Sequence, residues 1–473
     1  MSNIQKTRRS DPPHVNIEHQ ATQLGEDLVN IALDLGAQAV DATVGFGKSI
    51  KSKARDQEVE AVSVSSSHAA GVRVIVDGQL GFATSAQAPK TQKDARELVE
   101  TAISLARIAT SSPYNVLPQE DIADVAQLSD EIKELDLWDP AAAELKAAWT
   151  ISNALQMEEV LRKTEGIETT QEVSCSSSCH TFALASSNGF VGASSGTFSS
   201  LSASAVTKDG DGKKQVDGWW SASRHQDELD SPEDVSTEAA RRVKAKCGAR
   251  KISSARVPVI YDPSMARSFL GAILGALSGD SIAQRASFFL NQEKTSVLPS
   301  GIRLIDDPTI PKAMGSCIFD GEGMRVAKTT LIDEQGHIQT WLNDARSAKQ
   351  LGEKPGGHAS RGATSLPGPS WSNAILLGGQ GTLEDIVADT KEGLLVTHLL
   401  GHSPDMITGE YSRGASGFWI ENGEIAYPVE EITVAGDMVK MMQCIDFVGN
   451  DHDTRSSIHA PTIRFAELQV SGT

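Results

Sequence analysis

The chain has 473 residues, 39% of them hydrophobic, which is enough for two or three domains with a sizeable core. Acidic residues outnumber basic ones by 62 to 43, which argues against nucleic-acid binding because that function needs clustered Lys and Arg. No run of about 18 apolar residues could span a membrane, the N-terminus lacks an apolar signal segment, and five scattered cysteines fit reduced thiols, so we expect a cytoplasmic protein.

The N-terminal region is predicted to be a small α+β domain over residues 17–110, after a disordered tail at 1–16. Apolar residues recur at helical spacing up to Gly36, and a second amphipathic helix is expected over 90–109. Between them the pattern predicts strands at 39–44 and 58–64. A hairpin follows, in which 72–76 pairs with 80–83 through the turn Asp77-Gly78.

A middle region is predicted over residues 119–248, after the Ser- and Pro-rich break at 111–118. Its first part is acidic and helical, with the clearest helix at 142–160. Alternating apolar residues from 168 to about 220 then predict antiparallel strands, with Asn188-Gly189 as a turn. A helix should begin at Ser231, where a capping residue precedes a proline, and end at Gly248.

The C-terminal region, 250–473, is predicted to be mostly antiparallel β-structure. A strand at 257–261 leads into a helix at 264–277, and a glycine-, serine- and proline-rich loop fills 352–370, a length that usually marks a functional or mobile segment. Further along, a β-meander is predicted. Its first two strands, 417–421 and 424–427, are joined by Asn422-Gly423, and a third strand at 431–435 follows Pro428. Further elements are expected at 324–332 paired with 337–342, at 374–377, after Thr382 and at 394–400.

Two short motifs resemble ligand sites but fit structural roles better. Gly45-Phe-Gly-Lys-Ser49 lacks the first glycine of a phosphate-binding loop, since position 42 is alanine, and no apolar helix follows; we interpret it as a turn between strands. Cys175, Cys179 and His180 lie in a predicted strand. Residues four apart on a strand are about 13 Å apart, which is too far for one tetrahedral metal ion.

His398 and His402 have the i, i+4 spacing of a zinc pair on a helix. The residue after His398 is leucine, where a metallopeptidase would carry its glutamate base, and the segment 394–400 is strand-like. A self-sufficient metallopeptidase using these two histidines is therefore the weakest of three functional hypotheses. A partly buried or cavity-facing His402 is preferred.

Two separated segments carry a resemblance to a known family: GVRVIVDGQLGFA at 71–83 and GEYSRGASGFWIENGEI at 409–425, the latter continued by YPVEEITVAG at 427–436. Both segments resemble the TldD/PmbA family, a family of zinc metalloprotease subunits. The residues of these segments are more similar to the PmbA (TldE) branch than to the TldD branch. The resemblance implies an α+β fold with a large curved antiparallel β-sheet in the C-terminal domain, and two different subunits that close around a chamber in which peptides are cut.

Zinc ligands of the TldD branch are missing from this chain. In that branch they lie in an HExxxH helix just ahead of a Gly-Asp, and a late cysteine completes the site. Counting back from Gly279-Asp280, the His, Glu and His positions hold Leu270, Gly271 and Gly275, and no cysteine follows Cys444. We therefore predict no catalytic or metal-binding residue here, and zinc in the partner subunit.

The leading hypothesis is a non-zinc subunit that pairs with a TldD-like zinc-bearing subunit and contributes chamber wall and peptide binding. Unfolded or flexible peptides would be the substrates, held as an added strand along a sheet edge. Tyr411, Arg413, His402 and the loop 352–370 are the candidates for lining the chamber. The alternative is a stand-alone, catalytically silent homodimer that binds peptides.

Overall fold

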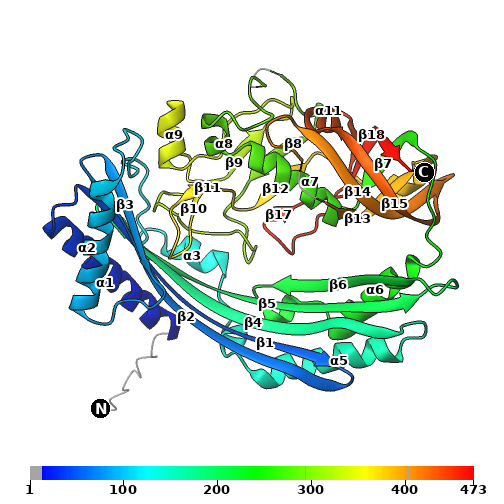
Figure 1. Cartoon of the computed structure of the whole chain (residues 1–473), viewed down its shortest axis with the longest axis horizontal. Coiled ribbons are helices and arrows are strands. Elements are labelled where there is room, and N and C mark those ends of the chain that lie inside the picture. Colours follow the sequence, from blue (N-terminus) through cyan, green and yellow to red (C-terminus); the bar gives the residue numbers. More distant parts are fainter. Residues whose placement is uncertain (1–12, 293–294, 402–403, 473) are drawn as a thin grey trace, which may run out of the picture.

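The structure is a computed structural model that describes residues 13–292, 295–401 and 404–472. Its first half is built on one six-stranded antiparallel sheet with the strand order β3-β2-β1-β4-β5-β6. The sheet is long and strongly curved, and its concave side faces the C-terminal half (Figure 1). The strands are β1 (Ala39–Arg55), β2 (Glu58–Val76), β3 (Gln79–Ser85), β4 (Thr169–Ser186), β5 (Val191–Lys208) and β6 (Lys214–Ser223).

Four helices cover the convex side of this sheet in two groups. One group packs on the alanine- and valine-rich ends of β1, β2 and β4, and the other packs on the opposite ends of β4 and β5. Capping fixes where they begin: Thr91 and Asp94 form a reciprocal capping box, and Ser231 precedes Pro232. The helices are α1 (Pro13–Asp34), α2 (Gln92–Ile108), α5 (Ala147–Lys163) and α6 (Pro232–Ala245), with α3 (Ser129–Leu135), α4 (Pro140–Ala143) and the 3₁₀ helix η1 (Gln226–Glu228) between them.

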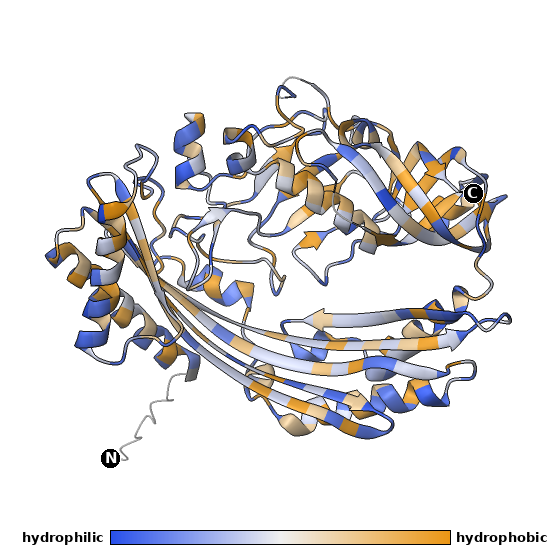
Figure 2. Cartoon of the chain, viewed as in Figure 1, coloured by the Kyte–Doolittle hydropathy of each residue, from blue (hydrophilic) through white to orange (hydrophobic). Residues whose placement is uncertain are grey.

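Alternation along the strands decides which side of the sheet meets the helices. On β1, Ala42 and Val44 are fully buried beneath α1 and α2, whereas Gly45 and Ser49, at alternate positions, face the concave side. The resulting bands of apolar and polar residues along the strands are visible in Figure 2. The concave side is thereby left small and polar around Ser49, whereas nearer one end of β4 Leu184 and Phe182 pack in an apolar cluster with Ile318 and Phe319.

The C-terminal half holds a six-stranded sheet, in the order β15-β14-β13-β7-β18-β16, and a four-stranded sheet, in the order β17-β12-β8-β9. An additional pairing of β15 with β18 curls the larger sheet into a barrel-like shape. The strands are β7 (Ala255–Tyr261), β8 (Arg303–Asp306), β9 (Thr329–Ile332), β10 (Ala359–Ser360), β11 (Gly368–Pro369), β12 (Ala374–Leu377), β13 (Glu392–Leu400), β14 (Glu410–Glu421), β15 (Glu424–Asp437), β16 (Ile445–Val448), β17 (Ile458–His459) and β18 (Ile463–Ser471).

One large apolar core joins this half together, and α7 lies at its centre. The core fills the space between α7, α11 and the strands β7, β13, β14 and β18. A smaller cluster around Ile386 and Ile420 packs α10 on the other face of the sheet. The helices are α7 (Pro263–Ala276), α8 (Gly279–Ala283), α9 (Ala345–Leu351), α10 (Leu383–Ala388) and α11 (Met438–Gln443).

The α+β fold with a curved C-terminal sheet is confirmed, but the predicted meander is wrong in one respect. Asn422-Gly423 does turn β14 into β15, yet Pro428 lies inside β15 instead of separating two strands. The β14–β15 ladder shifts register on both sides of Pro428. Such irregularities let a proline sit in a strand although it has no N–H to donate.

Gly45 to Ser49 also differ from their prediction as a turn, because they lie in the middle of β1. The chain reverses later, at Asp56-Gln57, where both residues have positive φ. The predicted turns at Asp77-Gly78 and Asn188-Gly189 are confirmed. Within the described ranges, none of the helices combines the length and apolarity needed to traverse a lipid bilayer.

Candidate functional site

The helix α7 carries the region where the TldD branch would hold zinc. It begins at Asp262, whose carboxylate accepts a hydrogen bond from the backbone N–H of Met265 at 2.9 Å, and Pro263 occupies its first position. One face is buried through Phe269, Leu270 and Ile273. The opposite face is partly exposed and consists of Arg267, Ser268, Gly271, Ala272 and Gly275.

Arg413 lies against this exposed face. Its Nη1 donates a hydrogen bond to Oγ of Ser268 at 2.8 Å, which ties β14 to α7. The side chain is half-buried, and its Nε is buried without a hydrogen-bond partner in the part of the chain that the structure describes. Arg413 is therefore a half-buried cation held beside the small-residue face of α7.

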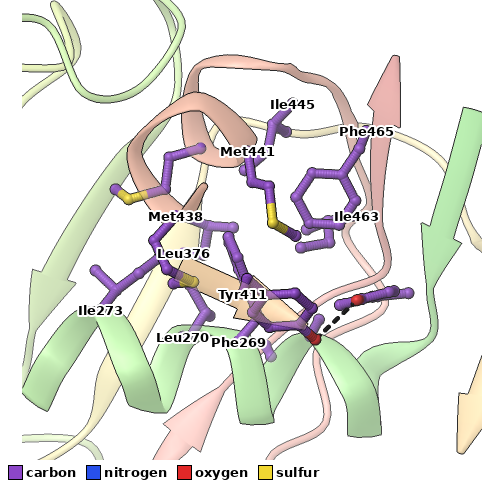
Figure 3. Packing of buried hydrophobic residues seen from close by; sticks show 14 of the residues in the cluster. Phe269, Leu270, Ile273, Leu376, Tyr411, Met438, Met441, Ile445, Ile463 and Phe465 are labelled. Atoms are coloured by element: carbon purple, nitrogen blue, oxygen red, sulfur yellow. Dashed lines mark hydrogen bonds between the residues drawn. The ribbon is translucent and has the colours of Figure 1, made fainter. Parts of the chain in front are cut away.

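Tyr411 does not line a surface, contrary to the candidate role given to it above. Its side chain is 2% exposed and its hydroxyl lies 2.8 Å from the hydroxyl of Tyr261. The ring packs edge-on against Phe269 in the core of the C-terminal half (Figure 3). Burial raises the pKa of Tyr411 above its ordinary value. Both neighbours are core residues, so Tyr411 takes a packing role and leaves no face for a peptide.

His402 lies outside the described residues, and His398 is exposed on β13. Partial burial nevertheless lowers the pKa of His398, and the charge of Lys246 lowers it further. Arg242 and Arg413 act in the same direction, and only the carboxylate of Asp217 opposes them. These neighbouring cations make the surroundings of His398 unfavourable for a metal ion.

A cavity of about 730 Å³ opens next to these charges, between α6, β13 and the β14–β15 turn. Asp262 and Arg242 line it, together with Thr397. Burial raises the pKa of Asp262 to about 6, against the hydrogen bond from Met265 and the charge of Arg242. Charged groups from the middle and C-terminal regions therefore border on space that a ligand can enter.

A stack of arginines and tryptophans joins β6 to α7, and sequence reasoning missed it. Arg455 lies over Trp219 at 4.2 Å and over Trp220 at 4.7 Å, and Arg267 of α7 lies over Trp220 at 5.3 Å. Nη1 of Arg455 also donates to the backbone carbonyl of Trp220 at 2.6 Å. The adjacent tryptophans in a chain with 5% aromatic residues were the signal that could have drawn attention to this place.

The concave surface between the two halves is lined by small hydroxyl side chains. Ser176 and Ser200 are hydrogen-bonded at 2.9 Å across β4 and β5, and Ser49 and Ser65 at 2.7 Å across β1 and β2. The first pair is partly exposed. Short polar side chains leave room above the sheet and offer both donors and acceptors.

The loop 352–370 crosses to the concave surface at one end of the sheet. The carbonyl of Ala363 accepts a hydrogen bond from Thr43 at 3.0 Å, and Gly45 and Gly71 leave space for the loop, because a Cβ on either would lie within 3 Å of Ala363. Arg361 reaches the buried carboxylate of Asp41 at 2.9 Å. The loop is thus docked on the sheet and borders the concave surface.

The residues on α7 do not fit a zinc ion. Zinc in a hydrolytic site takes three protein ligands from His, Glu, Asp or Cys, and the exposed face of α7 offers none of these types. Across the described part of the chain, there is also no group of three or more His, Cys, Asp or Glu side chains arranged to hold a metal. We derive no metal-dependent step for this chain.

Comparison with known families accounts for the fold. Three family models match in sequence order: the PmbA/TldA metallopeptidase domain 1 at residues 40–106, the central domain at 137–246 and the C-terminal domain at 254–472. The fold and the site region therefore define a member of the metallopeptidase class in which the site helix lacks metal ligands. The chain belongs to the PmbA/TldD family and, within it, to the PmbA branch.

Individual relatives agree with this assignment along nearly the whole chain. The metalloprotease PmbA of Escherichia coli O157:H7 is 33% identical over 457 residues, which cover 94% of this chain and 96% of the relative. A candidate modulator of DNA gyrase from Bacteroides thetaiotaomicron has a crystal structure that matches with a TM-score of 0.87 at 25% identity, covering 97% and 100% of the two chains. The crystal structure of TldE from Thermococcus kodakarensis matches with a TM-score of 0.81 at 21% identity, covering 95% and 100%.

Proposed function

We propose that this chain is the non-zinc subunit of a two-subunit peptidase that works in the cytoplasm on unfolded or flexible peptides. A TldD-like partner supplies the zinc ion, its bound water and the glutamate that takes the water proton. The observation that carries the proposal is the composition of α7, which has only aliphatic, small and cationic side chains on its exposed face. A peptidase-family chain with such a helix needs a second chain for bond cleavage.

The chain's own contribution is to form one wall of the reaction chamber and to hold the peptide. The hydroxyl-lined concave surface offers hydrogen bonds to an extended backbone without selecting particular side chains. Arg413 offers a cation beside α7 for a peptide carbonyl or carboxylate. Both features suit a substrate that is recognised by its extended backbone.

The test is a cleavage assay on an unfolded peptide with the purified chain alone, with a TldD-like partner alone, and with both. We expect chelator-sensitive cleavage that requires the partner and rises when this chain is added. Chelator-sensitive cleavage by the isolated chain would contradict the proposal. If no complex forms at micromolar concentrations and the isolated chain binds peptide, the stand-alone peptide-binding homodimer becomes the better description.

Arg413 provides a sharper test within the active complex. Arg413→Gln should raise KM several-fold and leave kcat nearly unchanged, because it removes a charge that holds the peptide while the zinc chemistry stays in the partner. Arg256→Gln is the matched control, since Arg256 is a surface residue paired with Glu467 at 2.7 Å. Equal effects of the two substitutions on KM would show that Arg413 does not contact the peptide.

A further inference from the structure

The cavity of about 730 Å³ between α6 and α10 lies away from the concave surface. On one side it is bounded by α6, which covers the convex side of the N-terminal sheet. On the other side it is bounded by α10, which packs on the face of the C-terminal sheet opposite to the α7 core. Its volume falls within the range of ligand sites, roughly 300–1,000 Å³. The cavity is therefore a second place where a small ligand fits.

Arg242 of α6 lines this cavity and is short of hydrogen-bond acceptors. Its side chain is 15% exposed, lies over Trp219 at 5.1 Å and donates no hydrogen bond to any residue that the structure describes. The nearest carboxylate is that of Asp217, 3.7 Å from Nε, and Lys246 holds the same carboxylate at 2.8 Å. The guanidinium group therefore retains N–H donors for an anion.

Asp262 supplies the opposite charge, at the point where β7 leads into α7. Its side chain is 5% exposed and accepts a hydrogen bond from the backbone N–H of Met265 at 2.9 Å. Within the described ranges Asp262 forms no salt bridge, although the charge of Arg242 acts on it from a distance. A buried carboxylate without an ion pair attracts a cation. The cavity thus presents one anionic and one cationic group.

Apolar side chains form much of the remaining wall. They come from α10, β13, β14 and the start of β15, and they are Leu383, Val387, Leu395, Phe418 and Ile425. Glu384 and Glu424 also line the cavity, but both are exposed, so solvent and salt screen their charges. The wall therefore favours a ligand with an apolar body and a charged group for each of the two buried side chains.

We propose that this cavity binds a short peptide of two or three apolar residues with both ends free. The C-terminal carboxylate pairs with Arg242, the N-terminal ammonium pairs with Asp262, and the apolar side chains pack against α10 and β13. A zwitterion satisfies both buried charges, whereas an acid or an amine leaves one of them unpaired. Such peptides are products of peptide cleavage, so the source of the ligand rests on the proposed function, but the binding itself does not.

Calorimetric titration of the full chain, without any partner, tests the binding with the dipeptide Leu-Leu. N-acetyl-Leu-Leu lacks the ammonium and Leu-Leu amide lacks the carboxylate, while both keep the apolar side chains. Each should bind at least tenfold more weakly than Leu-Leu, because it leaves a buried charge of the protein unpaired. Equal affinities for the three compounds would contradict the proposal, and this comparison needs only the wild-type chain.

Substitutions assign each end of the peptide to its partner. Asp262→Asn keeps a residue type that caps helices, and the variant should no longer distinguish N-acetyl-Leu-Leu from Leu-Leu. Arg242→Gln should no longer distinguish Leu-Leu amide from Leu-Leu. Both variants should bind Leu-Leu at least tenfold more weakly than the wild type. Undiminished discrimination in either variant, or the opposite assignment of the two ends, would refute the contacts.

Asp437→Asn and Arg96→Gln are the matched controls for these substitutions. Asp437 caps α11 by accepting a hydrogen bond from the backbone N–H of Lys440 at 3.0 Å, and Arg96 on α2 is paired with Glu100 at 2.8 Å. Neither residue lines the cavity. Both variants should bind Leu-Leu as the wild type does, and an equal loss of affinity in the controls would overturn the assignment.

Competition separates the cavity from the concave surface. A long unfolded peptide with an acetylated N-terminus and an amidated C-terminus has no free end and should not displace Leu-Leu. Displacement would place the dipeptide on the surface proposed for the substrate and overturn the inference. No binding of Leu-Leu at millimolar concentration would overturn it as well, even with partner-dependent cleavage intact. Binding of Leu-Leu without any cleavage by the two-subunit mixture would count against the proposed function alone.

Discussion

The hydroxyl pair Tyr261–Tyr411 links β7 and β14 inside the C-terminal core. Both side chains are nearly inaccessible, and the two oxygens are 2.8 Å apart. Tyr411→Phe keeps the ring and leaves the Tyr261 hydroxyl without this partner. We expect a loss of about 1–2 kcal/mol in the free energy of unfolding, measured by urea denaturation. Unchanged peptide affinity is also expected, because the side chain is buried.

The double variant Tyr261→Phe/Tyr411→Phe is the control for this interpretation. Replacing both partners by apolar groups of the same shape leaves no buried hydroxyl unpaired, so the double variant should lose less stability than the sum of the single variants. Additive losses would mean that the two hydroxyls contribute independently of each other.

Titration of Glu322 makes the free energy of unfolding depend on pH, and a single substitution can separate this contribution from that of other groups. Burial raises the pKa of Glu322 to about 7, against the opposing charge of Arg73, from an ordinary value of 4.5. Between these two values the folded state binds more protons than the unfolded state, so this group's contribution to stability falls as the pH rises from about 4.5 to 7.

Glu322→Gln removes this contribution. The variant should be about as stable as the wild type at pH 5, where the wild-type side chain is protonated, and relatively more stable at pH 8, by on the order of 2 kcal/mol. Urea midpoints at pH 5, 6, 7 and 8 measure the difference. Glu120→Gln, at an exposed pair with Lys354, serves as a control and should give a nearly flat difference. A flat difference for Glu322→Gln as well would refute the assigned titration.

At the scale of elements, Gly81 allows α2 to pack closely on β3. A Cβ at this position would lie 2.0 Å from the carbonyl oxygen of Ala102 and 2.5 Å from the amide nitrogen of Ala106. Gly81→Ala should therefore push α2 away and cost about 1–3 kcal/mol in unfolding free energy, with faster hydrogen exchange in α2. Gly210→Ala is the control, because a Cβ there meets nothing within 4 Å, and it should stay within about 0.5 kcal/mol.

Elements with local signals could be predicted from the sequence. The turn at Asp77-Gly78 and the helix start at Ser231 depend on side chains that interact within three or four residues. Pro428 misled the prediction because its acceptance in β15 depends on register shifts against β14. The turn predicted at Gly45 to Ser49 was wrong because this segment pairs within the sheet and the chain reverses only at Asp56. Non-local pairing overrode the local preference in both places.

The sequence was sufficient to predict that the candidate site lacks zinc ligands, but not where the side chains of Tyr411 and Arg413 lie. The absence of zinc ligands on α7 can be read directly from residues 264–279. Arg413 does reach that helix, but Tyr411, two residues earlier, has its side chain in the core. The neighbours of these two side chains, Tyr261 on β7 and Ser268 on α7, lie 150 and 145 residues earlier in the chain. No local pattern in β14 specifies those contacts.

At the scale of the whole molecule, a buried cluster of four charges fastens the N-terminal sheet to the C-terminal half. Arg73 donates to Asp41 at 2.8 Å and to Glu322 at 3.0 Å, and Arg361 donates to Asp41 at 2.9 Å. Burial alone would raise the pKa of Asp41, but the charges of Arg361 and Arg73 lower it below its ordinary value. The two guanidinium groups therefore hold Asp41 as a buried carboxylate between them.

Asp41→Asn breaks this arrangement, because Arg361 loses the carboxylate with which it pairs and Arg73 keeps only its contact with Glu322. Removing one partner of a buried ion pair costs about 3–5 kcal/mol, and the ion pair between Asp41 and Arg361 helps to hold the loop 352–370 on the sheet. We expect a lower urea midpoint and at least tenfold faster tryptic cleavage after Arg361, whose side chain is fully buried in the wild type.

Glu120→Gln is the matched control for Asp41→Asn, because it makes the same acid-to-amide change at a pair that also joins the two halves. Glu120 and Lys354 are 70% and 81% exposed, so this substitution should leave both the urea midpoint and cleavage after Arg361 nearly unchanged. Equal effects of the two variants would mean that the buried cluster contributes no more than a surface ion pair. A large effect of Asp41→Asn alone would identify the cluster as the contact on which the relative position of the sheet and α7 depends.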